Sequence, residues 1–117
     1  MNNILVVTDS RADFDKIFHK FAMKDHYQVY QTQVLEYALM HKYPENISVP
    51  LITIDAIIVV ISGGDIPNPD PLPGVAYHYI IMDEDKLPPM FLPLYTHALM
   101  FSAQLDLYKI VKSSINN

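Results

Sequence analysis

The chain of 117 residues contains no cysteine. It can form no disulfide bond, and it offers neither a thiolate nucleophile nor cysteine ligands for zinc. The first three residues carry no basic side chain, and the apolar run at residues 4–7 is too short for a signal-peptide core or a membrane span. From these absences we expect a cytoplasmic protein with no membrane contact.

Positive charge is also scarce. The chain has 8 lysines and arginines against 13 acidic residues, which gives a formal net charge of -5 at pH 7. The lysines are scattered along the sequence rather than pooled in one segment. Nucleic-acid backbones would on average be repelled by such a chain, so we expect no nucleic-acid partner.

Hydrophobic residues make up 50% of the chain, which suffices for the core of a single domain over residues 1–117. The most informative stretch is residues 55–65, a β-branched apolar run that stops at Ser62-Gly63-Gly64-Asp65. A run without polar alternation predicts a central strand of a parallel sheet, covered by helices on both faces. Ligands bind at the carboxyl ends of such strands, so residues 62–65 mark the candidate functional edge.

Hydrophobic periodicity predicts the other elements. A first strand at residues 4–8 leads to a helix with Ser10 as its N-cap and Asp13 three residues later. A second helix has Val34, Leu35, Ala38 and Leu39 as its apolar positions, and a last helix is capped by Thr96. Further strands are expected at residues 27–32, 77–82 and 90–92. One face of the last helix is expected to consist of Leu99, Ala103, Leu107, Ile110, Val111 and Ser114. The order predicts a three-layer αβα sandwich with a mostly parallel sheet of about five strands, in SIS-like or flavodoxin-like order.

Polar residues at the predicted strand ends allow two kinds of site. Hydroxyls and glycine N–H groups suit an anion, whereas Asp9, Asp65 and Asp83 offer oxygen ligands for a hard cation. A carboxylate about 4 Å from a phosphate charge costs roughly 4 kcal/mol, and one hydroxyl hydrogen bond returns only about 0.5–1.5 kcal/mol. A bound phosphate therefore requires that Asp65 point away or that a metal lie between them. The alternative is that these acids are solvated cap and turn residues.

Several segments resemble SIS (sugar isomerase) domains. Residues 55–62 are similar to the strand that begins with aspartate and ends at that family's serine-rich phosphosugar loop. Phe101-Ser102-Ala103-Gln104-Leu105 resembles the Phe-Thr-x-Gln-Leu segment of the closing helix in the isomerase part of glucosamine-6-phosphate synthase. Glu36-Tyr37 is similar to the family's Glu-Phe pair, and Asp9-Ser10 falls at its first ligand-binding turn. The resemblance implies an αβα domain that binds a small phosphorylated sugar, usually within a homodimer.

The resemblance assigns roles to particular residues. The ligand contacts would be Ser10, Ser62, Gly63, Gly64 and Thr96, with no metal and no cofactor. Isomerisation would need a general base near Ser62, for which His97, Glu36 and Asp65 are the candidates. The family's loop is Ser-x-Ser-Gly-x-Thr, whereas this chain keeps one hydroxyl and gains the charge of Asp65. We therefore expect weakened or lost isomerase activity.

A second family fits the length of the chain equally well. Receiver domains share the five-stranded parallel plan, but their acidic pair, phosphorylated aspartate and lysine are not matched here. Asp9 stands alone, the third strand ends in Ser62, and Pro93-Leu94 replaces the expected lysine-proline. The alternative function is thus a non-catalytic protein-interaction domain or a pseudo-receiver.

Overall fold

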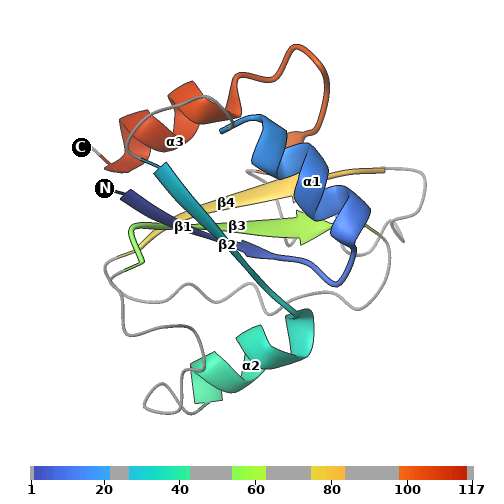
Figure 1. The fold of residues 1–117 in the computed structure, drawn as a ribbon, viewed down its shortest axis with the longest axis vertical. Coiled ribbons are helices and arrows are strands. Elements are labelled where there is room, and N and C mark those ends of the chain that lie inside the picture. The colour runs from blue at the N-terminus through green and yellow to red at the C-terminus, as the bar shows by residue number, and fades with distance from the viewer. Residues whose placement is uncertain (1, 22–26, 43–53, 63–74, 84–97, 116–117) are drawn as a thin grey trace.

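The computed structural model describes residues 2–21, 27–42, 54–62, 75–83 and 98–115. Among the described elements, strands and helices alternate up to the third strand, and the fourth and fifth strands and the last helix come after it (Figure 1). The elements are β1 (Asn2–Val7), α1 (Arg11–His19), β2 (Tyr27–Thr32), α2 (Val34–Lys42), β3 (Ala56–Ile61), β4 (Ala76–Ile81), β5 (Leu99–Met100) and α3 (Leu107–Ile115).

The strands form one sheet of five, in the order β2-β1-β3-β4-β5, and every neighbouring pair is parallel. This is the order of flavodoxin-like doubly wound sheets. The predicted fold class is confirmed. All carboxyl ends of the strands lie at the same edge of the sheet, which is the edge to which the sequence assigns the candidate site.

The apolar run singled out in the sequence occupies the centre of the sheet. All six residues of β3 are buried, because β1 and β4 flank the strand and helices cover the faces of the sheet. Asp55 precedes the strand rather than starting it. Its backbone N–H donates to the carbonyl of Asn3 at 2.9 Å, and its Oδ2 accepts from the Asn3 N–H at 2.7 Å. Asp55 therefore joins β1 to the amino end of β3 through two hydrogen bonds.

Alternate side chains of the strands pack into two cores on opposite faces of the sheet. On one face α1 and α3 lie side by side, and Ile17, Leu107 and Val111 pack on Ile4, Ile58 and neighbouring residues (Figure 1). On the other face α2 packs through Tyr37 on Leu5, Val7, Ile57 and Val59. The helices thus form the two outer layers predicted for an αβα sandwich.

The helix predicted from Val34, Leu35, Ala38 and Leu39 is observed as α2, but three of these four residues are exposed. Tyr37 is fully buried, whereas Leu35 and Leu39 are 73% and 49% exposed. Val34 packs on the same core as Tyr37.

The end of the chain also differs from expectation. Leu99 and Met100 pair with Ile80 and Ile81 of β4 as a short strand, so the predicted helix does not extend through them. The last helix starts only at Leu107, and Asp106 Oδ1 accepts from the Lys109 N–H at 3.1 Å at its beginning. The segment Phe101-Ser102-Ala103-Gln104-Leu105 therefore lies between β5 and α3, not within a helix. The fifth strand predicted at residues 90–92 falls outside the described residues.

Candidate functional site

The candidate site lies where the direction of winding reverses. From β1 the chain crosses to β2 on one side, while β3 and β4 continue on the other side of β1. Open parallel sheets bind ligands in the crevice that such a reversal leaves at the carboxyl ends of the strands. Here the residues after β1 are Thr8, Asp9 and Ser10, and the residue after β3 is Ser62.

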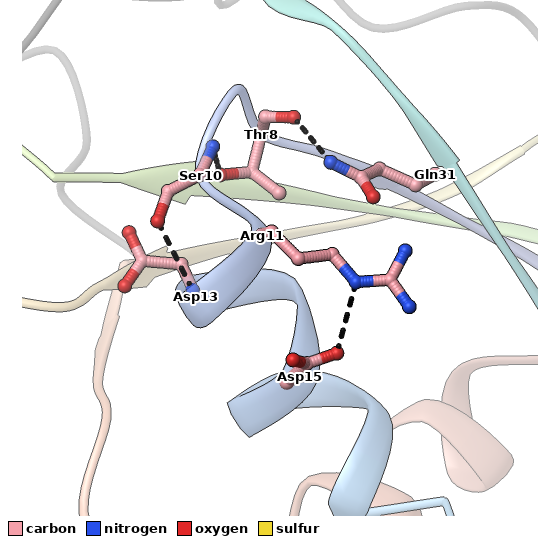
Figure 2. Close-up of polar contacts among 6 residues, drawn as sticks. All are labelled: Thr8, Ser10, Arg11, Asp13, Asp15 and Gln31. Carbon is pink, nitrogen blue, oxygen red and sulfur yellow. Dashed lines mark hydrogen bonds and ion pairs between the residues drawn. The ribbon is translucent and has the colours of Figure 1, made fainter.

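Ser10 is the N-cap of α1, as the sequence predicts. Its Oγ accepts a hydrogen bond from the Asp13 N–H at 3.2 Å, and its own N–H donates to Thr8 Oγ1 at 3.1 Å (Figure 2). A hydroxyl that accepts from a cap N–H still has its own hydrogen to donate. Half-buried Ser10 therefore places one donor at the carboxyl edge, beside the positive end of α1.

The loop after β1 is hydrogen-bonded to β2. The Thr8 N–H donates to the Thr32 carbonyl at 3.0 Å, and Gln31 Nε2 donates to the Thr8 carbonyl at 3.1 Å (Figure 2). Thr8 and Thr32 are both buried. The backbone that carries Ser10 is thus positioned by the sheet.

Asp9 is exposed, but its carboxylate has a structural partner. Oδ1 accepts from the Val34 N–H at 2.9 Å, so Asp9 caps the first turn of α2. A carboxylate at a helix N-terminus is stabilised by the helix dipole. The negative charge of Asp9 is therefore directed at α2, which lessens its repulsion of an anion beside Ser10.

Arg11 is a residue of this edge that the sequence analysis did not single out. It directly follows Ser10, and its Nε lies 3.3 Å from Asp15 Oδ1, with both side chains largely exposed (Figure 2). Exposed ion pairs contribute about 0–1 kcal/mol, so a ligand anion can compete for this guanidinium. A sequence signal was present, since Arg11 is the one arginine of the chain and stands in the first turn of a predicted helix.

Ser62 is half-buried at the end of β3, next to the strand that leads to Ser10. The structure therefore brings these two predicted ligand contacts to adjacent strand ends. Gly63, Gly64 and Thr96, the remaining predicted contacts, lie outside the described residues. So do Asp65 and His97, two of the three predicted candidates for a general base.

Glu36, the third candidate base, has a structural contact. Its Oε2 accepts from Thr32 Oγ1 at 3.0 Å, which joins α2 to the buried end of β2. The helix follows β2, the outermost strand, and β1 lies between β2 and β3. Glu36 thus contacts the end of β2, a strand that is separated from β3 by β1.

The alternative is a cation site, but the described part of the chain contains no cluster of ligands for it. Asp9 follows β1 and Asp83 follows β4, with β3 between these strands. Among the described residues no group of three histidine or acidic side chains could hold a metal ion. Asp65, the third acid of that interpretation, is not described.

Comparison with known proteins supplies no ligand or activity for this site. No family model, curated protein or solved structure matches the chain. Within the described ranges no helix has the length and hydropathy needed to cross a membrane. The functional argument therefore depends on the adjacent carboxyl ends of β1 and β3.

Proposed function

We propose that this chain binds a small phosphorylated sugar in the crevice between the loop after β1 and the end of β3, as an SIS-like domain with weakened or lost isomerase activity. The observation that supports this most directly is the position of Ser10 and Ser62. They follow β1 and β3, the two adjacent strands at which the sheet reverses its winding. Both residues are half-buried, which suits side chains that contact a ligand.

The electrostatics of the described edge are compatible with a phosphate. Ser10 stands at the N-terminus of α1, where N–H groups and the helix dipole favour an anion. Arg11 adds a full positive charge in the same turn; its guanidinium pairs with exposed Asp15 and lies 5.2 Å from the centre of the Phe14 ring. Asp9 and Asp13 contribute negative charges: the Asp9 carboxylate is bound to the first turn of α2, and Asp13 stands in the first turn of α1.

Thermal unfolding tests the proposal. Glucosamine-6-phosphate and fructose-6-phosphate, each at millimolar concentration, should raise the melting temperature by mass action, and unphosphorylated fructose should not. Inorganic phosphate at the same concentration reports how much of the effect the phosphate group supplies alone. An unchanged melting temperature with both phosphorylated sugars would remove the proposal.

Variants at Ser10 separate ligand binding from helix capping. Ser10→Asn and Ser10→Asp both retain an N-cap acceptor, so α1 should remain capped in each. Asparagine removes the hydroxyl, whereas aspartate also places a negative charge at the site. The ligand-induced rise in melting temperature should fall in Ser10→Asn and vanish in Ser10→Asp. The same charge at exposed Ser113 on α3 is the matched control and should leave the rise intact.

One observation favours the second candidate function, a protein-interaction domain. Leu35 and Leu39 lie one turn apart on α2 and are 73% and 49% exposed. Adjacent exposed leucines favour association with another apolar surface. Light scattering on the protein and on a Leu35→Lys, Leu39→Lys double variant tests self-association. A dimer that the double variant converts to a monomer supports this candidate, and a monomeric parent protein excludes a homodimer through α2.

A further inference from the structure

The outer edge of β2 is open among the described residues. In the order β2-β1-β3-β4-β5 this strand comes first, and no described strand lies beyond it. An open edge presents backbone N–H and C=O groups that can pair with another strand. At the opposite end of the sheet β5 spans only Leu99–Met100, so β2 is much the longer of the two edge strands.

β2 also lacks the features that usually prevent pairing at an edge. Edge strands are commonly protected by charged side chains, by proline, by a bulge or by short length. The six residues of β2, Tyr-Gln-Val-Tyr-Gln-Thr, include no charged residue and no proline. All of them pair with β1 in one continuous register, from Asn2 opposite Tyr27 to Val7 opposite Thr32, so no bulge interrupts the strand. The strand is therefore suited to take a further strand at its outer edge.

The hydrogen bonds to β1 identify the groups of β2 that point outward. The Thr8 N–H donates to the Thr32 carbonyl at 3.0 Å, so the backbone groups of Thr32 are directed at β1. Successive residues of a strand direct their N–H and C=O groups to opposite sides. The backbone groups of Tyr27, Val29 and Gln31 therefore point away from the sheet.

We propose that a second copy of this chain pairs with this edge, with the two β2 strands antiparallel about a two-fold axis at Val29. In this register Val29 lies opposite Val29 of the second copy, and Tyr27 lies opposite Gln31. Every outward N–H and C=O group of β2 then has a partner. An axis at Gln28 would leave Gln31 without a partner in the strand, and an axis at Tyr30 would leave Tyr27 without one.

A second copy fits this edge because the strand is complementary to itself. Val29 packs with the core beneath α1 and α3, and its half-buried side chain meets the same β-branched side chain on the axis. On the face covered by α2, exposed Gln28 lies opposite half-buried Tyr30. No like charges meet along the strand, although each chain carries a net charge of -5. Such an interface presents the same surface from both subunits, as two-fold symmetry requires.

The mass of the protein in solution, measured by light scattering, tests the pairing. The parent protein should be a dimer. Val29→Pro removes an N–H that points away from β1, so the pairing of β1 with β2 remains while dimerisation should weaken by about tenfold or more. The Leu35→Lys, Leu39→Lys double variant changes the exposed leucines of α2 and should remain dimeric. A monomeric parent protein overturns the proposal, whether the edge then takes a strand of another protein or none. A dimer that Val29→Pro leaves intact or that the double variant abolishes overturns it as well.

Single cysteines test the register, because the chain has no cysteine of its own. Val29→Cys places two thiols opposite each other on the axis, at a Cα separation of about 5.5 Å that a disulfide can span. In Gln28→Cys the two thiols are diagonal neighbours about 7–8 Å apart, which is beyond that range. Under mild oxidation Val29→Cys should therefore form a linked dimer about tenfold faster or more than Gln28→Cys. Equal rates, or faster linkage in Gln28→Cys, overturn the register.

Amide hydrogen exchange provides a readout in the unmodified chain. As the protein concentration is raised through the range of dimer formation, exchange of the Tyr27, Val29 and Gln31 amides should slow. Exchange at these amides that is independent of protein concentration while the mass doubles overturns pairing through β2. These measurements need no ligand and are thus separate from sugar binding at the ends of β1 and β3.

Discussion

Asp9 Oδ1 accepts a hydrogen bond of 2.9 Å from the backbone N–H of Val34, so the loop after β1 caps α2, a helix that begins 25 residues later. The next residue, Ser10, caps α1 on the opposite face of the sheet. Asp9 and Ser10 therefore each accept a hydrogen bond from a backbone N–H in the first turn of a helix, with one of these helices in each outer layer. This arrangement fixes the loop after β1 and directs the one carboxylate within it at α2.

Replacing Asp9 tests this capping role. Asp9→Ala removes the acceptor for the Val34 N–H and should lower the free energy of unfolding by about 0.5–2 kcal/mol. Asp9→Asn keeps an acceptor and should lose less. Urea denaturation of both variants measures the difference. Equal stability of the alanine variant and the parent protein would contradict the capping role.

Lys20, just beyond α1, connects two segments distant in sequence. Its Nζ donates to the carbonyls of Ser102 at 2.9 Å, Ala103 at 3.3 Å and Leu105 at 2.9 Å, and lies 5.2 Å from the centre of the Phe101 ring. Lys20→Met keeps much of the apolar stem but loses these donors. We expect a loss of about 1–3 kcal/mol in the free energy of unfolding.

Lys16→Met is the control for Lys20→Met. Lys16 is on the same helix and is exposed, so its replacement should change stability by less than about 0.5 kcal/mol. Hydrogen exchange should also accelerate at residues 102–105 in Lys20→Met alone. Equal effects of the two substitutions would show that the carbonyl contacts do not stabilise this segment.

The hydroxyls of Tyr37 on α2 and Tyr77 on β4 are hydrogen-bonded to each other. Tyr37→Phe removes this bond but keeps the ring, and should cost about 0.5–1.5 kcal/mol in the free energy of unfolding. Tyr37→Ala also empties the fully buried position and should cost about 3–5 kcal/mol. Chemical denaturation distinguishes the two losses.

Tyr30→Phe provides the comparison for Tyr37→Phe. Tyr30 packs on the same core, but no hydrogen bond of its hydroxyl is found within the described residues. This substitution should therefore be close to neutral. A loss at Tyr30 as large as that of Tyr37→Phe would mean that the Tyr37–Tyr77 bond contributes nothing specific.

The sequence predicted most strands and the first helix because their signals are local. The strand predicted at residues 27–32 is observed as β2, and the apolar run predicted as a strand buried on both faces is observed as β3. The Ser10 cap was equally visible, since a serine followed three residues later by an acid satisfies the first N–H groups of a helix.

The errors arose where contacts distant in sequence decide the structure. The apolar spacing from Leu99 to Val111 resembles one helical face, but Leu99 and Met100 complete the sheet beside β4. The Lys20 ammonium donates hydrogen bonds to carbonyls that follow Phe101. Asp106 then caps a separate helix, because its carboxylate accepts from the Lys109 N–H. Periodicity alone cannot reveal these contacts. On α2, likewise, only the assembled sheet determines that Tyr37 rather than Leu35 faces inward.

The candidate site was predicted in outline only. A strand that ends in Ser62 and a turn that contains Ser10 are local features, and the parallel topology is enough to place both at one edge. The contact from Asp9 to α2 was not predictable, because it depends on the register in which β1 pairs with β2, where Val7 is opposite Thr32. Arg11 was overlooked because a single arginine in a helix is more often solvated than functional.

The most direct test of the account is an NMR titration of the ¹⁵N-labelled protein with glucosamine-6-phosphate. The proposal predicts saturable shifts of the amides of residues 8–11 and 61–62 at millimolar ligand, with no comparable response to unphosphorylated glucosamine. It also predicts that Arg11→Gln weakens the binding. Shifts that are absent at millimolar ligand, or that occur only away from the ends of β1 and β3, would contradict phosphosugar binding at this site.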